Sequence, residues 1–274
     1  MPWANNGEVK IYYETSGLGP DLLLVHANPF DHRLWMYQVS KFSPSYRTTS
    51  MDLRGYGRSD KPGGDFTLRD MSDDVFSVCQ AAGITKTIVM GISVGGIIAR
   101  QLYVDHGDLV RALILVGTGS YSNPDSRQFA DKNIERYGRE GLLTYYPLHL
   151  KSLLSEQFVK SDLGKHLISQ FLELAPNLNV QTIMQIYRAI KEWKDPVGSR
   201  DFVVPTLVIA GEFDNALNGS IEMSEKIPGS KHIQVAGAGH GCCLEQPAFF
   251  NSVVEEFLDT VNSSSELERR TGTM

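Results

Sequence analysis

The sequence predicts an α/β fold in which a mainly parallel sheet is covered by helices on both faces. Two observations support it. Short apolar runs alternate with helical patterns in the first third of the chain, and each run is continuous, as in strands buried on both sides. The alternation then stops between Gly117 and Pro205, where helical stretches occur without a convincing strand. Because this connection exceeds an ordinary crossover, we expect a helical cap inserted between two strands.

The individual elements follow from local patterns. Strands are expected where apolar or β-branched residues run together, at 9–14, 21–26, 47–52, 87–90, 112–116, 206–211 and 232–236. The strand at 9–14 is expected at an edge of the sheet, and the strand at 21–26 is expected to be fully buried. Helices are expected where apolar residues recur with helical spacing, at 67–82, 96–103, 125–139, 141–159, 163–174, 178–193 and 247–261. Proline residues at 124, 147, 176 and 196 punctuate the four cap helices.

These elements divide the chain into a core and an insertion. We expect residues 1–120 and 201–262 to form the core, and residues 121–200 to form the helical cap. The last residues, 263–274, are polar and are expected to be a disordered tail.

Composition limits the possible partners. The chain has 274 residues, a net charge of −6, no basic and apolar leader and no apolar run long enough for a membrane span. Because of the negative charge, nucleic acid and anionic membranes are not expected as main partners. The expected partner is a small-molecule substrate. The oligomeric state is left open. Three cysteines, Cys79, Cys242 and Cys243, cannot form a disulfide framework, which favours a cytoplasmic protein. We expect the adjacent pair to be buried thiols, and we expect no metal site.

The pentapeptide at 91–95 matches G-x-S-x-G. It follows the strand at 87–90 and precedes a helix, which is the context of a nucleophile elbow. The sharp turn forces Ser93 into a strained backbone conformation, and Gly91 and Gly95 leave the room that such a turn needs. The following helix directs free N–H groups at the reacting oxygen. Ser93 is therefore the candidate nucleophile.

A serine nucleophile needs a base and an orienting acid, in the chain order serine, acid, histidine. Asp214 and His240 follow two successive late strands, where open α/β sheets place their sites. Glu212 is the alternative acid, but it lies one residue from the strand and is expected to point elsewhere. His106, His149, His166 and His232 follow no strand end. The expected triad is Ser93, Asp214 and His240.

The loop after the strand at 21–26 is the expected oxyanion hole. The backbone N–H groups of Val94 and Asn28 are the candidate donors to the tetrahedral oxygen. His26 begins this loop, and we expect it to fix the loop by hydrogen bonds rather than to act on substrate. The Asn28-Pro29 pair is also compatible with a plain turn.

Five ordered segments together resemble the α/β-hydrolase superfamily with a helical cap, from about Val9 to Leu258. They are His26-Ala27-Asn28-Pro29 with Trp35, Asp52-Leu53-Arg54-Gly55-Tyr56-Gly57-Arg58-Ser59, Gly91-Ile92-Ser93-Val94-Gly95-Gly96, Gly211-Glu212-Phe213-Asp214, and Gly237-Ala238-Gly239-His240 followed by Glu245 and Pro247. The resemblance implies a mainly parallel, eight-stranded type of sheet. The nearest branch resembles 3-oxoadipate enol-lactonases and small carboxylesterases. One departure is Ala27, where the usual pair is His-Gly.

The His-x-Asn-Pro loop also resembles haloalkane dehalogenases, which, like epoxide hydrolases of this fold, use a carboxylate nucleophile. Ser93 in that position makes both activities unexpected here. The sequence instead predicts a serine hydrolase that cleaves a small carboxylic ester or lactone without a cofactor. Two alternatives stay open, namely hydrolysis of a carbon–carbon bond in a ring-fission diketone, and a slow-turnover ligand receptor on the same fold.

The cap sequence is rich in aromatic residues and leucine. An apolar cap over a polar triad forms a pocket that excludes water and selects the substrate. Met184, Tyr187 and Arg188 share one helix face by their spacing and are candidates to line this pocket. We expect the aromatic residues to pack the cap against the core and Arg188 to be a solvated helix charge, and lining of the pocket is the alternative for both. The remaining candidates are Tyr145, Tyr146 and Trp193.

Overall fold

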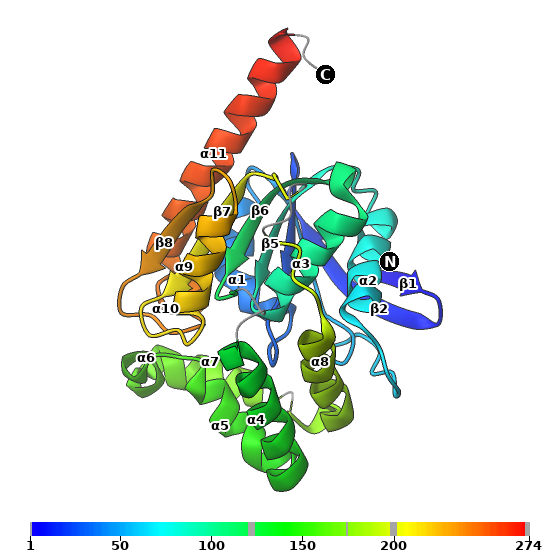
Figure 1. Ribbon diagram of the computed structural model, residues 1–274, viewed down its shortest axis with the longest axis vertical. Helices are drawn as coiled ribbons and strands as arrows, with labels where there is room; N and C mark the ends of the chain where they lie inside the picture. The colour runs from blue at the N-terminus through cyan, green and yellow to red at the C-terminus, as the bar shows by residue number, and fades with distance from the viewer. Residues whose placement is uncertain (1, 120–123, 174, 198–201, 272–274) are drawn as a thin grey trace.

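The computed structural model describes residues 2–119, 124–173, 175–197 and 202–271. Within them, eight strands form one sheet in the order β1-β2-β4-β3-β5-β6-β7-β8 (Figure 1). The strands are β1 (Trp3–Asn6), β2 (Val9–Ser16), β3 (Asp21–Val25), β4 (Arg47–Met51), β5 (Thr87–Ile92), β6 (Val110–Val116), β7 (Thr206–Gly211) and β8 (Lys231–Val235).

The sheet is parallel from β4 through β8, and β1 and β2 extend it in antiparallel pairing. β1 was not expected, because four residues carry too little pattern to indicate a strand. The carboxyl ends of the parallel strands lie at one edge of the sheet. This edge faces the cap, which is drawn in green below the sheet in Figure 1.

Helices cover both faces of the sheet. The core helices are α1 (Met36–Phe42), α2 (Leu68–Ala81), α3 (Val94–Asp105), α9 (Leu217–Lys226), α10 (Cys242–Glu245) and α11 (Pro247–Thr271). The cap helices are α4 (Pro124–Glu140), α5 (Leu142–Ser152), α6 (Glu156–Lys160), α7 (Asp162–Leu172) and α8 (Val180–Glu192). Three short 3₁₀ segments complete the described residues, η1 (His32–Trp35), η2 (Gly107–Leu109) and η3 (Ala175–Asn177).

Alternation along the strands divides the core into two layers. In β3, Leu23 and Val25 belong to a cluster with residues of α2, α3 and α9, whereas Leu22 and Leu24 belong to a cluster with residues of α1, α10 and α11. Successive side chains of a strand point to opposite faces, so continuous apolar runs supply both layers. The prediction of a sheet covered on both faces is confirmed.

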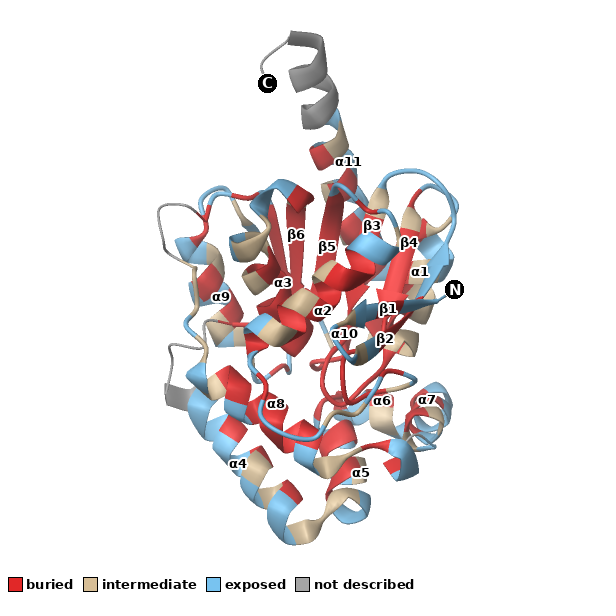
Figure 2. Cartoon of the chain, turned by 90° about the vertical axis from the view of Figure 1, so that its right-hand side faces the viewer, coloured by how far each residue is buried: buried red, intermediate tan, exposed pale blue. Residues whose placement is uncertain are grey.

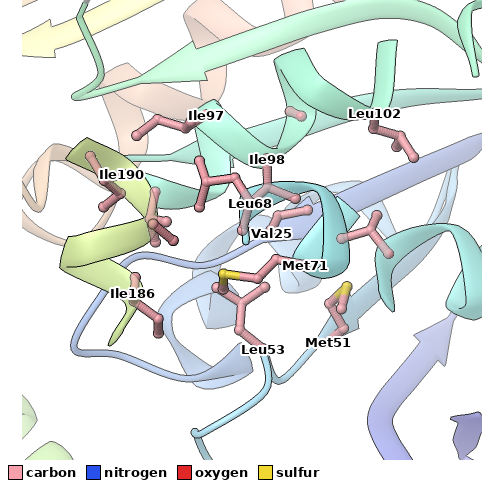
Figure 3. Close-up of a cluster of buried hydrophobic side chains, with 14 of the residues drawn as sticks. Val25, Met51, Leu53, Leu68, Met71, Ile97, Ile98, Leu102, Ile186 and Ile190 are labelled. Atoms are coloured by element: carbon pink, nitrogen blue, oxygen red, sulfur yellow. The ribbon is translucent and has the colours of Figure 1, made fainter. Parts of the chain in front are cut away.

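The cap packs on the core through its own apolar face. Ile186 and Ile190 of α8 lie in the same cluster as Met71 of α2 and Ile97 of α3 (Figure 3). Figure 2 shows that the central strands β3, β4, β5 and β6 are buried, whereas the cap presents much of its outer surface to solvent. Among the described residues, no helix combines the length and the apolar character needed to cross a membrane.

The structure differs from the expected helix at 141–159 and from the expected tail, and it does not describe the expected domain boundaries. The expected helix at 141–159 is divided into α5 and α6, because the Ser155 side chain caps α6 by accepting from Phe158 N–H. The expected disordered tail at 263–274 is corrected for residues 263–271, which continue α11; no proline or glycine interrupts this sequence before Gly272. The expected domain boundaries, at 120/121 and 200/201, lie outside the described residues.

A buried arginine joins both ends of the cap to the core. Arg100 on α3 is 0% exposed and forms an ion pair with Asp195 at 2.7 Å, on the segment that leaves the cap. It also donates to Thr118 Oγ1 (3.3 Å) and to the Gly119 carbonyl (3.1 Å), on the segment that enters the cap. The Trp193 ring lies 4.8 Å from its guanidinium. The two crossings are therefore held by one side chain of the helix that follows Ser93.

We expect Arg100→Met to lower the free energy of unfolding by about 3–5 kcal/mol, because it leaves the buried Asp195 unpaired. A double variant, Arg100→Met with Asp195→Leu, is expected to recover most of this loss, since it buries no unpaired charge. Chemical denaturation of the purified proteins measures both. Arg69→Met is the control, because Arg69 is exposed in its pair with Asp105 and is expected to change stability by less than about 1 kcal/mol.

Candidate active site

The G-x-S-x-G segment forms a sharp turn between β5 and α3. Ser93 adopts φ 55° and ψ −121°, the one positive φ of a non-glycine residue among those described. A Cβ on Gly91 would lie 2.3 Å from the Gly95 carbonyl oxygen, and a Cβ on Gly95 would lie 2.2 Å from the Val25 carbonyl oxygen. Both contacts are too short for a real side chain. The two glycines therefore allow the strained turn that presents Ser93 at the strand end.

Asp214 and His240 lie on neighbouring loops, after β7 and β8. The Asp214 Oδ1 atom accepts a hydrogen bond from His240 Nδ1 at 2.9 Å, and both residues are buried. Ala216 N–H also donates to Asp214 Oδ1 at 2.8 Å, which fixes the carboxylate. The loops themselves are joined, because Phe213 N–H donates to the Ala238 carbonyl at 2.9 Å.

Gly117, directly after β6, lies between the elbow and this pair. Ser93 N–H donates to the Val116 carbonyl at 2.8 Å, so the elbow adjoins the end of β6. A Cβ on Gly117 would lie 2.8 Å from Asp214 Oδ2 and 2.9 Å from His240 Nδ1. The structure thus brings Ser93, Asp214 and His240 to one edge of the sheet, where they follow β5, β7 and β8. Sequence reasoning missed Gly117, although a glycine directly after a buried strand was the available signal.

Glu212, the alternative acid, points elsewhere. Its side chain is exposed, and its Oε2 atom accepts from the Gly237 N–H at 2.8 Å. Of the two carboxylates considered from sequence, Asp214 is therefore the one that contacts the His240 ring. Glu212 instead closes the turn after β8.

The two candidate oxyanion donors come from separate loops. Val94 is the first residue of α3, and Asn28 lies in the loop after β3. Within the described residues, neither backbone N–H has a hydrogen-bond acceptor. Both groups are therefore free to donate to an oxygen of a bound molecule.

His26 holds the loop as expected from sequence. Its Nδ1 donates to the Ala27 carbonyl at 2.9 Å, and its Nε2 accepts from Leu53 N–H at 2.9 Å. Burial lowers the pKa of His26, although Asp52 opposes this effect, and the ring is neutral. His26 therefore positions the loop that carries Asn28.

A group that could hold a metal occurs beside this loop. Among the described residues, Asp31, His32 and Asp52 bring potential ligand atoms within 4.8 Å of one another. These atoms already have protein partners. His32 Nδ1 lies 2.6 Å from Asp52 Oδ1, and Asp31 forms an ion pair with Arg33 at 3.0 Å. The cluster is best described as an internal ion-pair network.

The cysteines are free and buried, as expected from sequence.

The loop that carries His240 is attached to the cap. Glu245 accepts from Gly239 N–H at 2.9 Å and from Ser155 N–H at 3.0 Å, and Gly241 N–H donates to the Leu153 carbonyl at 3.1 Å. The turn between α5 and α6 therefore rests on the histidine loop. A displacement of the cap at this point changes the environment of His240 directly.

Most of the cap residues proposed from sequence are buried. Tyr145, Tyr146, Tyr187 and Met184 are at most 8% exposed, whereas Arg188 is exposed. The expectation of a solvated Arg188 therefore agrees with the structure.

His149 follows no strand end, so the sequence does not indicate it as a site residue. In the structure it is buried in α5, and burial first, with the positive charge of His240 second, lowers its pKa to about 3. His149 is therefore neutral and close enough to His240 for their charges to interact. A position on a cap helix gives no sequence signal for this proximity.

The pKa of His240 is raised. Burial alone would lower it, but the charge of Asp214 and the hydrogen bond to Asp214 outweigh burial, and Glu245 adds to them. The raised pKa lies above the ordinary value of 6.5. A histidine that acts as a base must be neutral, so protonation with falling pH removes the active form.

We therefore expect kcat/KM to fall toward acid pH with a single-proton dependence whose midpoint lies above 6.5. Asp214→Asn removes the main cause of the raised pKa and is expected to move the midpoint to lower pH. The measurement is a pH profile of kcat/KM for a neutral substrate. A wild-type midpoint near 5 would contradict the assigned electrostatics.

The family model for the alpha/beta hydrolase fold matches residues 20–247, which is most of the chain. This chain belongs to the α/β-hydrolase family. The sheet, the elbow at its edge and the predicted family resemblance agree with this finding. The α/β-hydrolase family is broad, so membership establishes a hydrolase-type fold and leaves the substrate to be inferred from the site.

Individual relatives are distant in sequence. Epoxide hydrolase 3 of Xenopus tropicalis is 27% identical over 91% of this chain and 75% of its own length. A thermophilic esterase from Thermogutta terrifontis superposes with a TM-score of 0.82 at 26% identity, over 94% of this chain and 96% of its own. The enol-lactonase of Burkholderia xenovorans LB400 has a TM-score of 0.83 at 20% identity, over 94% of this chain and 100% of its own. The last similarity concerns the fold alone.

Proposed function

We propose that this α/β-hydrolase is a serine hydrolase that cleaves a small carboxylic ester or lactone through an acyl-enzyme. The observation that carries the proposal is the hydrogen bond from His240 Nδ1 to the buried Asp214, beside a strained Ser93. This bond leaves the other ring nitrogen of His240 to take a proton from serine. The similarity to a solved esterase supports the same reaction class.

The proposed reaction has two stages. His240 removes the Ser93 proton as Oγ attacks the ester carbonyl, and the N–H groups of Val94 and Asn28 stabilise the tetrahedral oxyanion. His240 then donates its proton to the leaving alcohol, or to the ring oxygen of a lactone. In the second stage, His240 activates a water molecule that attacks the acyl-enzyme, and Ser93 regains its proton as the acid departs. Asp214 orients and stabilises the imidazolium throughout.

The epoxide hydrolase among the relatives raises a second reaction class. Hydrolysis of epoxides in this fold uses a carboxylate nucleophile at the elbow, and this chain has Ser93 there. An alkoxide attack on an epoxide would leave a stable ether, which water does not release. We therefore assign the ester or lactone reaction.

Covalent labelling tests the proposal. A fluorophosphonate reagent should modify the protein once, and peptide mass spectrometry should locate the adduct on Ser93. Denatured protein is the control, because the reaction requires the assembled site. Failure of the folded protein to react, or an adduct on another residue, would contradict the assigned nucleophile.

A substrate panel separates the remaining reactions. Short-chain esters, lactones and a ring-fission diketone should be compared at equal concentration. We expect turnover of esters or lactones and little turnover of the diketone. Fast cleavage of the diketone alone would replace the proposal with carbon–carbon hydrolysis, and ligand-induced thermal stabilisation without product would favour a receptor.

A further inference from the structure

The side chain of Asn28 has an unpaired donor at the site. Asn28 is 4% exposed, and its Oδ1 accepts a hydrogen bond from the Tyr56 hydroxyl. Its Nδ2 has no hydrogen-bond partner among the described residues. A buried amide nitrogen without a partner is unfavourable, and such groups in native proteins commonly have a functional reason.

The position of this amide relates it to the scissile bond. Asn28 belongs to the loop after β3, and the same loop packs against the elbow, since a Cβ on Gly95 would lie 2.7 Å from the His26 carbonyl oxygen. Only the bonds of one residue separate Nδ2 from the backbone N–H that we assign to the oxyanion hole. The two donors can therefore reach substrate oxygens that are a few bonds apart.

The orientation of the amide is fixed by its neighbours. The Tyr56 hydroxyl donates to Oδ1, which leaves Nδ2 as the donor without a partner among the described residues. The Tyr56 ring meets the His26 ring edge-on, with centroids 5.5 Å apart, and His26 is itself bonded on both nitrogens. The carboxamide is thus preorganised by a network that does not include substrate.

Cap residues provide further polar groups without charge. The Tyr137 hydroxyl lies 2.8 Å from His149 Nδ1, and the Tyr187 hydroxyl lies 3.2 Å from His149 Nε2. Burial, followed by Tyr137 and Tyr146, raises the pKa of Tyr56 well above its ordinary value, so the Tyr56 hydroxyl is protonated. The neutral His149 completes a set of uncharged groups between the cap and the core.

Within the described residues, no buried arginine or lysine faces this set without a partner, and His240, whose charge acts on His149, is neutral when it acts as the base. The buried arginines are Arg54 and Arg100, and each is paired with a buried aspartate, at 2.5 Å and 2.7 Å respectively. The guanidinium of Arg136 lies near His149 but is bonded to both oxygens of Glu140, at 2.8 and 3.0 Å. A carboxylate on a substrate would therefore lose its hydration without gaining a counterion.

We propose that Asn28 Nδ2 binds a second oxygen of the substrate, and that the enzyme acts on uncharged esters or lactones oxygenated one or two carbons from the scissile carbonyl. This inference rests on the proposed serine hydrolase function. It assigns Tyr56 as the residue that positions Asn28, and it excludes acyl groups that carry a free carboxylate. A lactone with a carboxylate, as in an oxoadipate enol-lactone, is then a poor substrate.

Matched esters test the inference on the wild-type protein. Methyl acetoacetate and methyl butanoate differ in the second oxygen, and dimethyl and monomethyl malonate differ in charge. After division by the rate with hydroxide, kcat/KM should favour methyl acetoacetate over methyl butanoate by about 10- to 100-fold, the usual effect of one buried hydrogen bond. Dimethyl malonate should exceed monomethyl malonate by at least as much.

Two variants separate this role from general stability. Asn28→Ala should abolish the preference for acetoacetate over butanoate, a ratio that a uniform loss of activity does not change. Asn133→Ala is the matched control, because Asn133 is buried and accepts from the Tyr145 hydroxyl at 2.8 Å, but its amide already donates to the Phe129 carbonyl. This variant should keep the wild-type ratio.

The outcomes are distinct. Ser93-dependent hydrolysis without either preference, or a preference that survives Asn28→Ala, overturns this inference and leaves the serine hydrolase intact. Hydrolysis of none of the four esters overturns this inference and leaves the lactone reaction of the proposed function, whereas hydrolysis that persists in Ser93→Ala removes the proposed function and this inference with it. Both preferences, with loss of the first in Asn28→Ala, support the assignment.

Discussion

Replacement of Ser93 by alanine is expected to lower kcat for a short-chain ester by about 10⁴- to 10⁶-fold, because the three groups of a triad act as a unit. The residual rate would come from the oxyanion donors and from substrate binding alone. A continuous assay with the purified variant measures the effect, at enzyme concentrations high enough to detect a single turnover.

The fold of this variant should be unchanged. Alanine and serine have similar restrictions at φ 55°, so the melting temperature should shift by only a few degrees. Ser169→Ala provides the control for serine substitution, since Ser169 is exposed on the cap helix α7 and its hydroxyl donates to the His166 carbonyl of the same helix. Retention of wild-type turnover by Ser93→Ala would remove the serine mechanism.

The second large effect is expected at the acid. Asp214→Asn preserves the shape of the side chain but removes the charge that holds the imidazolium and the correct tautomer, and it should lower kcat by about 10⁴-fold. Glu212→Gln is the matched variant, with the same chemical change two residues earlier. It should alter kcat by less than a few-fold, because the Glu212 side chain is exposed and accepts from a turn N–H outside the site.

The two variants together test which carboxylate is the acid of the triad. If Glu212→Gln loses activity and Asp214→Asn does not, the assigned acid is wrong, although the fold is unaffected. If both lose activity equally, the loop after β7 matters as a whole, and the His240 hydrogen bond is not the decisive contact. Thermal unfolding of both variants excludes trivial loss of structure.

The position of the site could be predicted because it depends on strand ends. Ser93, Asp214 and His240 each follow an apolar run, and parallel strands bring their carboxyl ends to a common edge. The glycines around Ser93 added a local signal, since only the smallest residue fits their surroundings. These features arise from short sequence windows together with one rule of sheet topology.

The missed features depend on contacts between distant segments. The proximity of His149 to His240 follows from how the cap rests on the core, and helical periodicity on α5 does not specify that arrangement. β1 is stabilised by its pairing with β2, and its four residues have no pattern of their own. The polar composition of residues 263–271 predicts disorder, but the segment contains good helix formers and continues α11.

The contacts of Arg100 have a consequence for exchanging caps between members of this family. A transplanted cap would replace Asp195 while the α3 guanidinium, Thr118 and Gly119 stayed in place. Unless the incoming cap supplied a carboxylate like Asp195, the graft would enclose an unneutralised cation, since the two remaining acceptors are uncharged. Specificity in such chimaeras can therefore be transferred only as a unit that includes position 100, seven residues beyond the serine.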